Sequence, residues 1–312
     1  MAVPVGFLHR RCAFLEKRLL LIMNPRAGQK RANRYLPDML RLFSDYDYVT
    51  TAYMTGKQGD AAAFAAAHAA EADLVVAVGG DGTLNETVNG LLSAGIRRPV
   101  GYIPAGSTND FAASLRLSPS IMQAAKDIME GTPRPVDVGD FNGRSFTYVA
   151  SFGAFTETAY TTPQEVKNIL GHLAYILEGV KDLANIRSTP LRLVTDQLDI
   201  FEGEYLFGAI SNSTSIAGLM TMDPSRVIVD DGLFEITLIR MPTTAAELGR
   251  ILTSLQSQQY DEKMIETASA ARISIYSPNS VPWTLDGEYA KGAKEITVTN
   301  LHNAFDLITN RR

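Results

Sequence analysis

The sequence of 312 residues lacks the features that mark several common classes of protein. It has one cysteine, Cys12, which cannot form an intramolecular disulfide, and its four scattered histidines show no zinc-like spacing. No segment approaches the roughly 18 uninterrupted apolar residues of a membrane-spanning helix. These absences exclude a disulfide scaffold, a zinc site and a spanning helix, and a reducing cytoplasm is the simplest location.

Positive charge is also scarce. The net charge is -5, so the chain has no uniform positive field that could hold nucleic acid or an anionic membrane by long-range attraction. We therefore expect no nucleic-acid partner. Any contact with a membrane must be local.

Three familiar catalytic and nucleotide-binding motifs are missing from the sequence. It contains no Gly-x-x-x-x-Gly-Lys-Ser/Thr loop, no complete Gly-x-Gly-x-x-Gly run and no Gly-x-Ser-x-Gly nucleophile elbow. The common nucleotide triphosphatases and hydrolases therefore lose support.

What is present indicates a globular protein of two lobes. Hydrophobic residues make up 46% of the chain and charged residues 20%, which is enough apolar surface for packed interiors. Residues 1–17 are expected to form a short leader. From 18 to 133, short apolar runs at 18–23, 46–53, 74–78 and 100–103 alternate with helix-like runs at 31–43, 60–70 and 84–92. This alternation predicts a Rossmann-like α/β lobe with mainly parallel strands.

The ligand-binding rim of this lobe is predicted by the same pattern. Ligands of open parallel sheets bind beyond the carboxyl ends of the strands. That rule brings together residues 24–28, Thr55, 79–86 and 104–110. After about residue 134 the sequence changes to short alternating runs, which predict a β-rich lobe from 134 to 300 with two helical interludes at 163–184 and 244–257.

The strongest motif is Gly-Gly-Asp-Gly-Thr at 79–83, between an apolar strand and a helix-like run. Glycines let the backbone turn sharply and approach a ligand closely. Amides exposed at a helix N-terminus form a natural anion site. The motif therefore favours phosphate or nucleotide binding over a plain turn in which Asp81 caps the helix.

Two further loops repeat this arrangement after other strands. They are Asn-Pro-Arg-Ala-Gly at 24–28 and Ile-Pro-Ala-Gly-Ser-Thr-Asn-Asp-Phe at 103–111. Alone, the first could be a common turn and the second a helix N-cap. Three such loops in one lobe favour a composite pocket.

Two acidic turns lie in the second lobe. Asp230 and Asp231 precede Gly232, and their oxygens suit either a hard cation or an ordinary hairpin turn. Asp286 and Glu288 lie two residues apart, so in extended geometry both carboxylates point to one face. Such a pair suits one metal-binding group and one proton acceptor, although a simple turn is the alternative.

Taken together and in this order, the motifs resemble those of the bacterial diacylglycerol kinase-like lipid kinases. The shared series is Asn-Pro-x-x-Gly, Gly-Gly-Asp-Gly-Thr-x-Asn-Glu, Pro-x-Gly-Ser/Thr-x-Asn-Asp-Phe-Ala, Asp-Asp-Gly and Leu-Asp-Gly-Glu. This family is related to sphingosine kinases and, more remotely, to NAD kinases and phosphofructokinases. The resemblance implies an NAD-kinase-like α/β lobe, a β-rich sandwich lobe, and a final segment at about 301–312 that returns to the first lobe.

The resemblance also implies the site residues, with ATP and Mg²⁺ as cofactors. The implied ATP-binding residues are Asn24, Pro25, Arg26, Ala27, Gly28, Thr55, Gly80, Asp81, Gly82, Thr83, Leu84, Asn85, Glu86 and Ser107. Asp81 would also help to organise the magnesium of ATP. Asp231 would bind a structural magnesium together with backbone oxygens of Ile228 and Leu233. Glu288 would be the proton acceptor and Asp286 its partner.

The expected function is an ATP-dependent lipid kinase that phosphorylates a lipid hydroxyl, with diacylglycerol as the foremost acceptor. Phosphatidylglycerol, a sphingoid base and an undecaprenyl-type alcohol remain open as acceptors. Transient contact with the inner face of the membrane is expected, and a homodimer is left open. The alternatives are an NAD kinase-like enzyme with a soluble acceptor and a catalytically silent nucleotide or lipid sensor.

Overall fold

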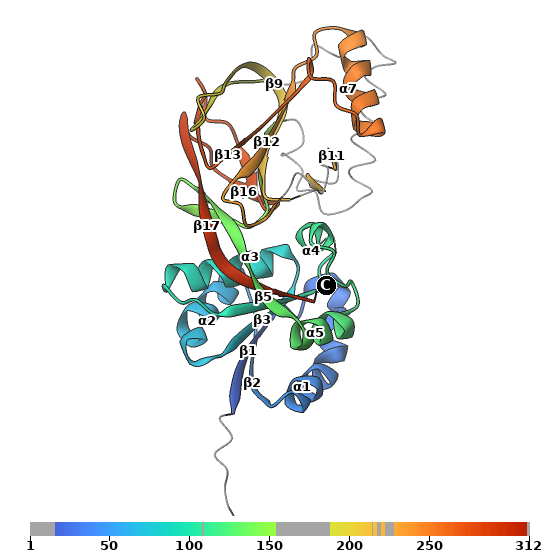
Figure 1. Cartoon of the computed structure of the whole chain (residues 1–312), viewed down its shortest axis with the longest axis vertical. Helices are drawn as coiled ribbons and strands as arrows, with labels where there is room; N and C mark the ends of the chain where they lie inside the picture. Colours follow the sequence, from blue (N-terminus) through green and yellow to red (C-terminus); the bar gives the residue numbers. More distant parts are fainter. Residues whose placement is uncertain are drawn as a thin grey trace, which may run out of the picture.

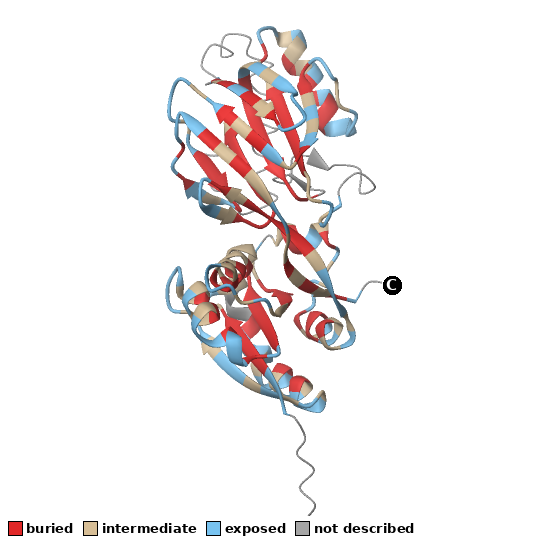
Figure 2. Cartoon of the chain, turned by 60° about the vertical axis from the view of Figure 1, so that its left-hand side comes forward, coloured by how far each residue is buried: buried red, intermediate tan, exposed pale blue. Residues whose placement is uncertain are grey.

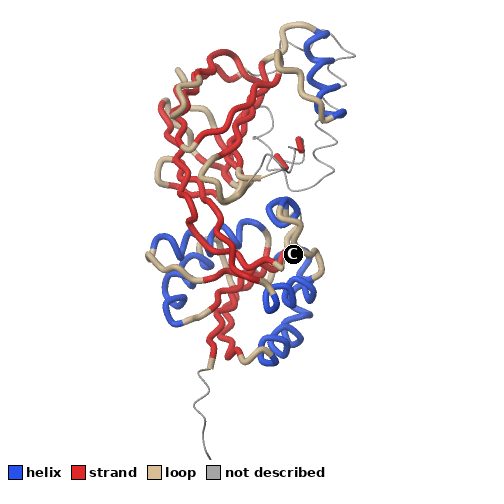
Figure 3. Tube along the Cα trace, in the orientation of Figure 1, coloured by secondary structure: helices blue, strands red, loops and turns tan. Residues whose placement is uncertain are grey.

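The computed structural model describes residues 16–107, 109–153, 188–213, 215–216, 220–221 and 228–310. The first 15 residues of the leader expected at 1–17 and the helix expected at 163–184 lie outside these ranges, and Lys17 already belongs to the first strand. Two lobes follow one another along the long axis of the molecule (Figure 1). Helices surround the strands of the first lobe, whereas strands dominate the second (Figure 3). The predicted α/β lobe followed by a β-rich lobe is confirmed.

The first lobe is built on parallel strands in the order β4-β3-β1-β2. The strands are β1 (Lys17–Met23), β2 (Tyr48–Met54), β3 (Leu74–Gly79) and β4 (Pro99–Pro104). The helices are α1 (Leu36–Asp45), α2 (Asp60–His68), α3 (Asp81–Ser93), α4 (Asp110–Ser114) and α5 (Ile121–Glu130), with 3₁₀ segments η1 (Ala27–Tyr35) and η2 (Ala69–Glu71).

The central strands of this lobe are covered on both faces. Every residue of β3 is buried, as expected for a strand between two helical layers. One face packs against α1 and α5, and the other packs against α2 and α3. The helix expected at 31–43 differs, because a 3₁₀ segment precedes α1 and Pro37 lies in the first turn of α1, where proline is tolerated.

The second lobe contains antiparallel strands that enclose a core of their own. The strands are β5 (Thr132–Phe141), β6 (Arg144–Phe146), β7 (Val149–Gly153), β8 (Thr189–Thr195), β9 (Ile200–Ser211), β10 (Ser215–Ile216), β11 (Met220–Thr221), β12 (Phe234–Arg240), β13 (Ile265–Ala270), β14 (Arg272–Tyr276), β15 (Trp283–Leu285), β16 (Glu288–Ala290) and β17 (Glu295–Thr309). Helix α7 (Ala245–Ser257) corresponds to the expected helix at 244–257, and Thr244 and Glu247 form its capping box.

Aromatic side chains fill the centre of this second core. Trp283 lies between Phe141 and Phe152, at centroid distances of 5.1 and 4.8 Å, and Phe146 packs on Phe234. Buried residues are concentrated on the strands of both lobes (Figure 2). None of the helices in the described ranges is long and apolar enough to cross a membrane.

Two long strands pass from one lobe into the other. β17 pairs with β14 in the second lobe and then, through Asp306 and Leu307, pairs in parallel with β4 of the first. β5 runs antiparallel beside β17 over most of its length, with a register shift between Leu301 and Phe305. The lobes are therefore joined by paired strands, which fix the orientation of one lobe relative to the other.

Candidate active site

The loops at the carboxyl ends of the parallel strands meet around a cavity of about 540 Å³. Hydrogen bonds tie these loops together: Asn24 donates its backbone N–H to Val78 O, and Thr55 donates to Met23 O. The lining residues are Asn24, Arg26, Ala27, Gly28, Thr55, Gly56, Lys57, Gln58, Ala61, Gly80, Gly82, Thr83, Glu86, Gly106, Ser107 and Glu288. Each segment of the rim predicted from the sequence therefore contributes residues to one cavity.

Glycine is required at two points where these loops touch. Gly28 has a φ of +48°, and a side chain there would collide with Ala105 O. A Cβ on Gly106 would lie 2.6 Å from Gly80 Cα. The loops after β1, β3 and β4 can therefore approach one another only because these positions carry no side chain.

Asp81 opens helix α3 but does not cap it. The N-cap is Gly80, and no side chain accepts a capping hydrogen bond there. Instead, Tyr102 donates its hydroxyl to Asp81 Oδ1 at 3.1 Å. Burial raises the pKa of Asp81 to about 7; the Tyr102 hydrogen bond lowers it, whereas nearby Asp110 and Asp286 raise it. Asp110 and Asp286 therefore lie close enough to disfavour the charged form of Asp81.

Some side chains predicted for the nucleotide site point elsewhere. Leu84 is fully buried in the core, so only its backbone could meet a ligand. Pro25 is absent from the lining, and its carbonyl accepts Asn33 Nδ2 at 3.1 Å. Asn85 points to the second lobe and donates to Asp286 Oδ2 at 2.6 Å. The one-dimensional motif cannot distinguish these directions.

Glu86 lines the cavity and also supports a neighbouring helix. Its carboxylate accepts the backbone N–H groups of Gly59 at 2.8 Å and Ala61 at 3.2 Å. These are orphan amides of the first turn of α2, which has no side-chain N-cap of its own. Glu86 therefore fixes the loop that carries Lys57 into the cavity wall.

Asp286 is a buried carboxylate that joins the lobes. Its two oxygens accept the backbone N–H groups of Thr147, Tyr148 and Val149 at 2.7–3.0 Å, the Thr147 hydroxyl at 2.8 Å and the Asn85 amide. Burial raises the pKa of Asp286, and the hydrogen bonds from Thr147, Val149 and Tyr148 oppose that shift. Five donors occupy this carboxylate, which leaves it little capacity as a free base.

Glu288 has the opposite environment. It lines the nucleotide cavity from the second lobe, and its side chain is 38% exposed. Its Oε2 accepts Arg144 Nη2 at 3.1 Å. The expectation that Asp286 and Glu288 share one face of an extended segment is wrong, because Asp286 and Gly287, with φ of +51° and +83°, form the turn between β15 and β16.

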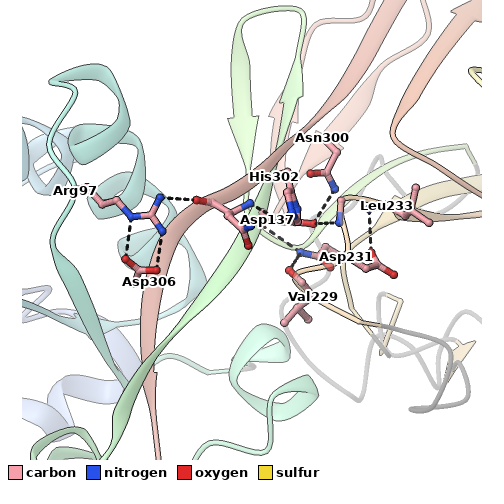
Figure 4. A network of polar contacts seen from close by, with 11 residues as sticks. Arg97, Asp137, Val229, Asp231, Leu233, Asn300, His302 and Asp306 are labelled. Carbon is pink, nitrogen blue, oxygen red and sulfur yellow. Dashed lines mark hydrogen bonds and ion pairs between the residues drawn. The ribbon is translucent and has the colours of Figure 1, made fainter.

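The acidic turn predicted to bind a structural metal has the form of a hydrogen-bonded turn. Asp231 Oδ1 accepts the backbone N–H of Leu233 at 2.9 Å (Figure 4). Both Asp231 and Ile228 are exposed. Within the described ranges, no three His, Cys, Asp or Glu side chains are arranged to hold a metal ion directly.

Asp137 is the residue of this region that the sequence interpretation missed. It is fully buried and accepts the N–H groups of Gly232 at 2.7 Å and Asn303 at 2.7 Å, together with the side chains of Asn300 and His302 (Figure 4). The sequence offered one signal for a buried acid here, because Asp137 lies between two valines, Val136 and Val138. Lys57 and Arg144 were also missed, because neither lies in a recognisable motif.

Comparison with known proteins agrees with this arrangement. Residues 18–141 match the family profile "Diacylglycerol kinase catalytic domain", and residues 150–309 match "YegS C-terminal NAD kinase beta sandwich-like domain". A diacylglycerol kinase of Staphylococcus epidermidis is 36% identical, over 95% of this chain and 93% of its own length. A diacylglycerol kinase of Bacillus subtilis is 35% identical, over 88% of this chain and 90% of its own length.

The fold has the same relatives. The crystal structure of a protein from Bacillus anthracis superposes on this chain with a TM-score of 0.75 and a sequence identity of 26%. The match covers 95% of each chain. A second crystal structure, described as a diacylglycerol kinase from the same organism, has a TM-score of 0.72 and a sequence identity of 24%. The match covers 95% of this chain and 97% of the other. The matched profiles, the long alignments and the shared fold show that this chain belongs to the diacylglycerol kinase family.

Proposed function

We propose that this protein transfers the γ-phosphoryl group of ATP to the hydroxyl of a lipid alcohol, with diacylglycerol as acceptor and phosphatidic acid as product. The observation that carries the proposal is the single cavity in which three glycine-rich loops face Glu288 of the other lobe. Phosphoryl transfer requires a positioned nucleophile and neutralised phosphate charge more than covalent help from the protein. The named relatives are diacylglycerol kinases, which supports the choice of acceptor.

The loops would bind the phosphates of ATP. Backbone amides at the start of α3 and the cations Arg26 and Lys57 line the cavity. Asn24, Gly28, Thr55 and Ser107 complete the wall of the proposed nucleotide site.

The residues around Asp81 fit a magnesium ion carried by ATP. Asp110 and Asp286 raise the pKa of Asp81, and a divalent cation would relieve that repulsion. Mg²⁺ keeps several waters and phosphate oxygens as ligands, so direct contact with three carboxylates is not required. When bound, the ion would supply positive charge to the phosphates. Asp231, with Ile228 O and Leu233 O, remains our proposal for a separate structural magnesium site.

Glu288 would act as the base. The acceptor O–H bond breaks, its proton passes to Glu288, and the acceptor oxygen bonds to the γ-phosphorus while the bond to the β-phosphate oxygen breaks and ADP leaves. Asp286, held by five donors, would instead fix the turn that presents Glu288.

The acceptor would be reached from the membrane surface. A diacylglycerol hydroxyl lies at the headgroup level of a bilayer, so peripheral contact at the inner face of the cytoplasmic membrane is sufficient. The net charge of -5 implies that such contact is local and does not come from a general basic field.

Labelled ATP and an acceptor panel test this proposal. The panel contains diacylglycerol, phosphatidylglycerol, a sphingoid base, an undecaprenyl-type alcohol and NAD⁺, and the products are separated by thin-layer chromatography. We expect label in phosphatidic acid only when diacylglycerol is present. Label in a phosphorylated NAD⁺ alone would favour the soluble-acceptor alternative, and no transfer to any acceptor would favour the silent sensor.

A further inference from the structure

Arg144 connects the β5–β6 hairpin to the strand that carries Glu288. It follows a tight turn in which Asn142 and Gly143 have φ of +49° and +87°, the geometry that a two-residue hairpin requires. Its Nη1 donates to Tyr289 O at 2.7 Å, and its Nη2 donates to Glu288 Oε2 at 3.1 Å. One guanidinium therefore holds both the backbone and the acid of β16.

The two carboxylate oxygens of Glu288 are thereby distinguished. Oε2 accepts a hydrogen bond from Arg144. Oε1 instead faces the glycine-rich loop at 79–83, since a Cβ placed on Gly82 would lie 3.7 Å from it. Without a fixed partner, a partly exposed glutamate samples many rotamers, and ordering it costs entropy. Arg144 removes much of that freedom and leaves Oε1 facing the cavity.

We propose that Arg144 is a positioning residue for phosphoryl transfer, which holds Glu288 so that Oε1 accepts the proton of the lipid hydroxyl. This inference rests on the proposed function of Glu288. Arg144 acts through Glu288 and needs no contact with ATP or acceptor for this role.

Arginine suits this position better than lysine. Its planar fork places two donors on two acceptors at once, whereas a lysine ammonium is a single point charge. The same hairpin also supports Asp286, since Thr147 follows directly after β6 and donates twice to that carboxylate. The segment from Arg144 to Val149 thus holds both acids of the Leu-Asp-Gly-Glu motif.

The test is a double-mutant cycle between Arg144→Ala and Glu288→Gln. The full chain is assayed with labelled ATP and diacylglycerol in detergent mixed micelles, and ATP binding and the thermal midpoint are measured on each variant. Arg192→Ala is the matched control, because Arg192 forms a similarly exposed ion pair with Glu202, 3.8 Å long, away from the cavity.

Arg144→Ala should lower kcat by about 10- to 100-fold, the effect of a misplaced reacting group, while the KM for ATP changes less than about twofold. Added to Glu288→Gln, it should lower kcat no further. Arg192→Ala should match the wild type. The inference is overturned if Glu288→Gln loses activity while Arg144→Ala behaves like Arg192→Ala, or if the two losses multiply. If Glu288→Gln itself keeps full activity, the proposed function of that residue fails instead.

Discussion

Asp81 is a half-buried acid whose folded-state pKa of about 7 lies above the unfolded value of about 4. The folded state therefore binds this proton more tightly than the unfolded state. Where the folded state holds more protons, stability falls as pH rises, here between about pH 4 and pH 7. This loss of stability on ionisation of Asp81 arises beside the cavity in which a cation-bound nucleotide would bind.

Asp81→Asn should separate stability from activity. Without divalent cations, the thermal midpoint of the variant should exceed that of the wild type above about pH 7, and the difference should vanish below about pH 4. Its kcat should fall by about 10²-fold or more, because charge beside the phosphates is lost. Asp45→Asn, at an exposed position, is the control. A pH-independent difference between Asp81→Asn and the wild type would contradict the account.

Asp286 and Glu288 should differ in what they contribute to folding. Asp286→Asn replaces an oxygen that faces hydrogen-bond donors with an amide, so unfolding should become easier by about 3 kcal/mol. Glu288→Gln, at a partly exposed site, should change stability by less than about 0.5 kcal/mol. Urea unfolding measures both, and equal stability losses would show that the two acids have similar structural roles.

At the scale of secondary-structure elements, helix α2 depends on an acid from helix α3. Glu86→Ala removes the acceptor of the Gly59 and Ala61 amides and should cost about 1 kcal/mol, as the loss of an N-cap does. Because α2 begins beside Lys57, the KM for ATP should rise as well.

The matched control for that variant is Thr244→Ala. It breaks the capping box of α7, far from the cavity, and should cost a similar free energy of unfolding. Its KM for ATP should stay at the wild-type value. If both variants changed the KM alike, a general loss of stability would explain the effect of Glu86→Ala.

Elements with strong local patterns could be predicted from sequence, and long-range contacts could not. The apolar run at 74–78 and the helical run at 244–257 each have a local pattern, and β3 and α7 lie close to these expected positions. Leu84 is buried in the core, whereas the direction of Asn85 depends on its contact with Asp286 of the second lobe. For the same reason, a motif could mark this loop but could not say which of its side chains face the cavity.

At the scale of the whole molecule, the lobes are held together by continuous strands and buried polar contacts. Asp137 on β5 joins β17 to the turn at Gly232, and Arg97 binds Asp306 of β17 through two hydrogen bonds of 2.8 and 2.9 Å (Figure 4). The valines on either side of Asp137 mark it as a candidate buried acid, but no local pattern predicts which donors from distant segments it binds.

The Asp231 turn makes a prediction about metal and global stability. If Mg²⁺ binds there only in the folded state, it should raise the thermal midpoint without nucleotide, by an amount that grows with Mg²⁺ concentration. Asp231→Asn should lose most of that gain, whereas Asp199→Asn, in the β8–β9 hairpin, should keep it. The metal proposal fails if Asp231→Asn gains as much from Mg²⁺ as the wild type.

The central claim is that a nucleotide in the first lobe reacts with an acceptor activated by Glu288 of the second. The most direct measurement is kcat for phosphate transfer from ATP to diacylglycerol by wild type and Glu288→Gln, with ATP affinity measured in parallel. We predict a loss of about 10²- to 10⁴-fold in kcat, the typical contribution of a general base, with ATP affinity nearly unchanged. A Glu288→Gln variant that keeps wild-type kcat on diacylglycerol would contradict the account.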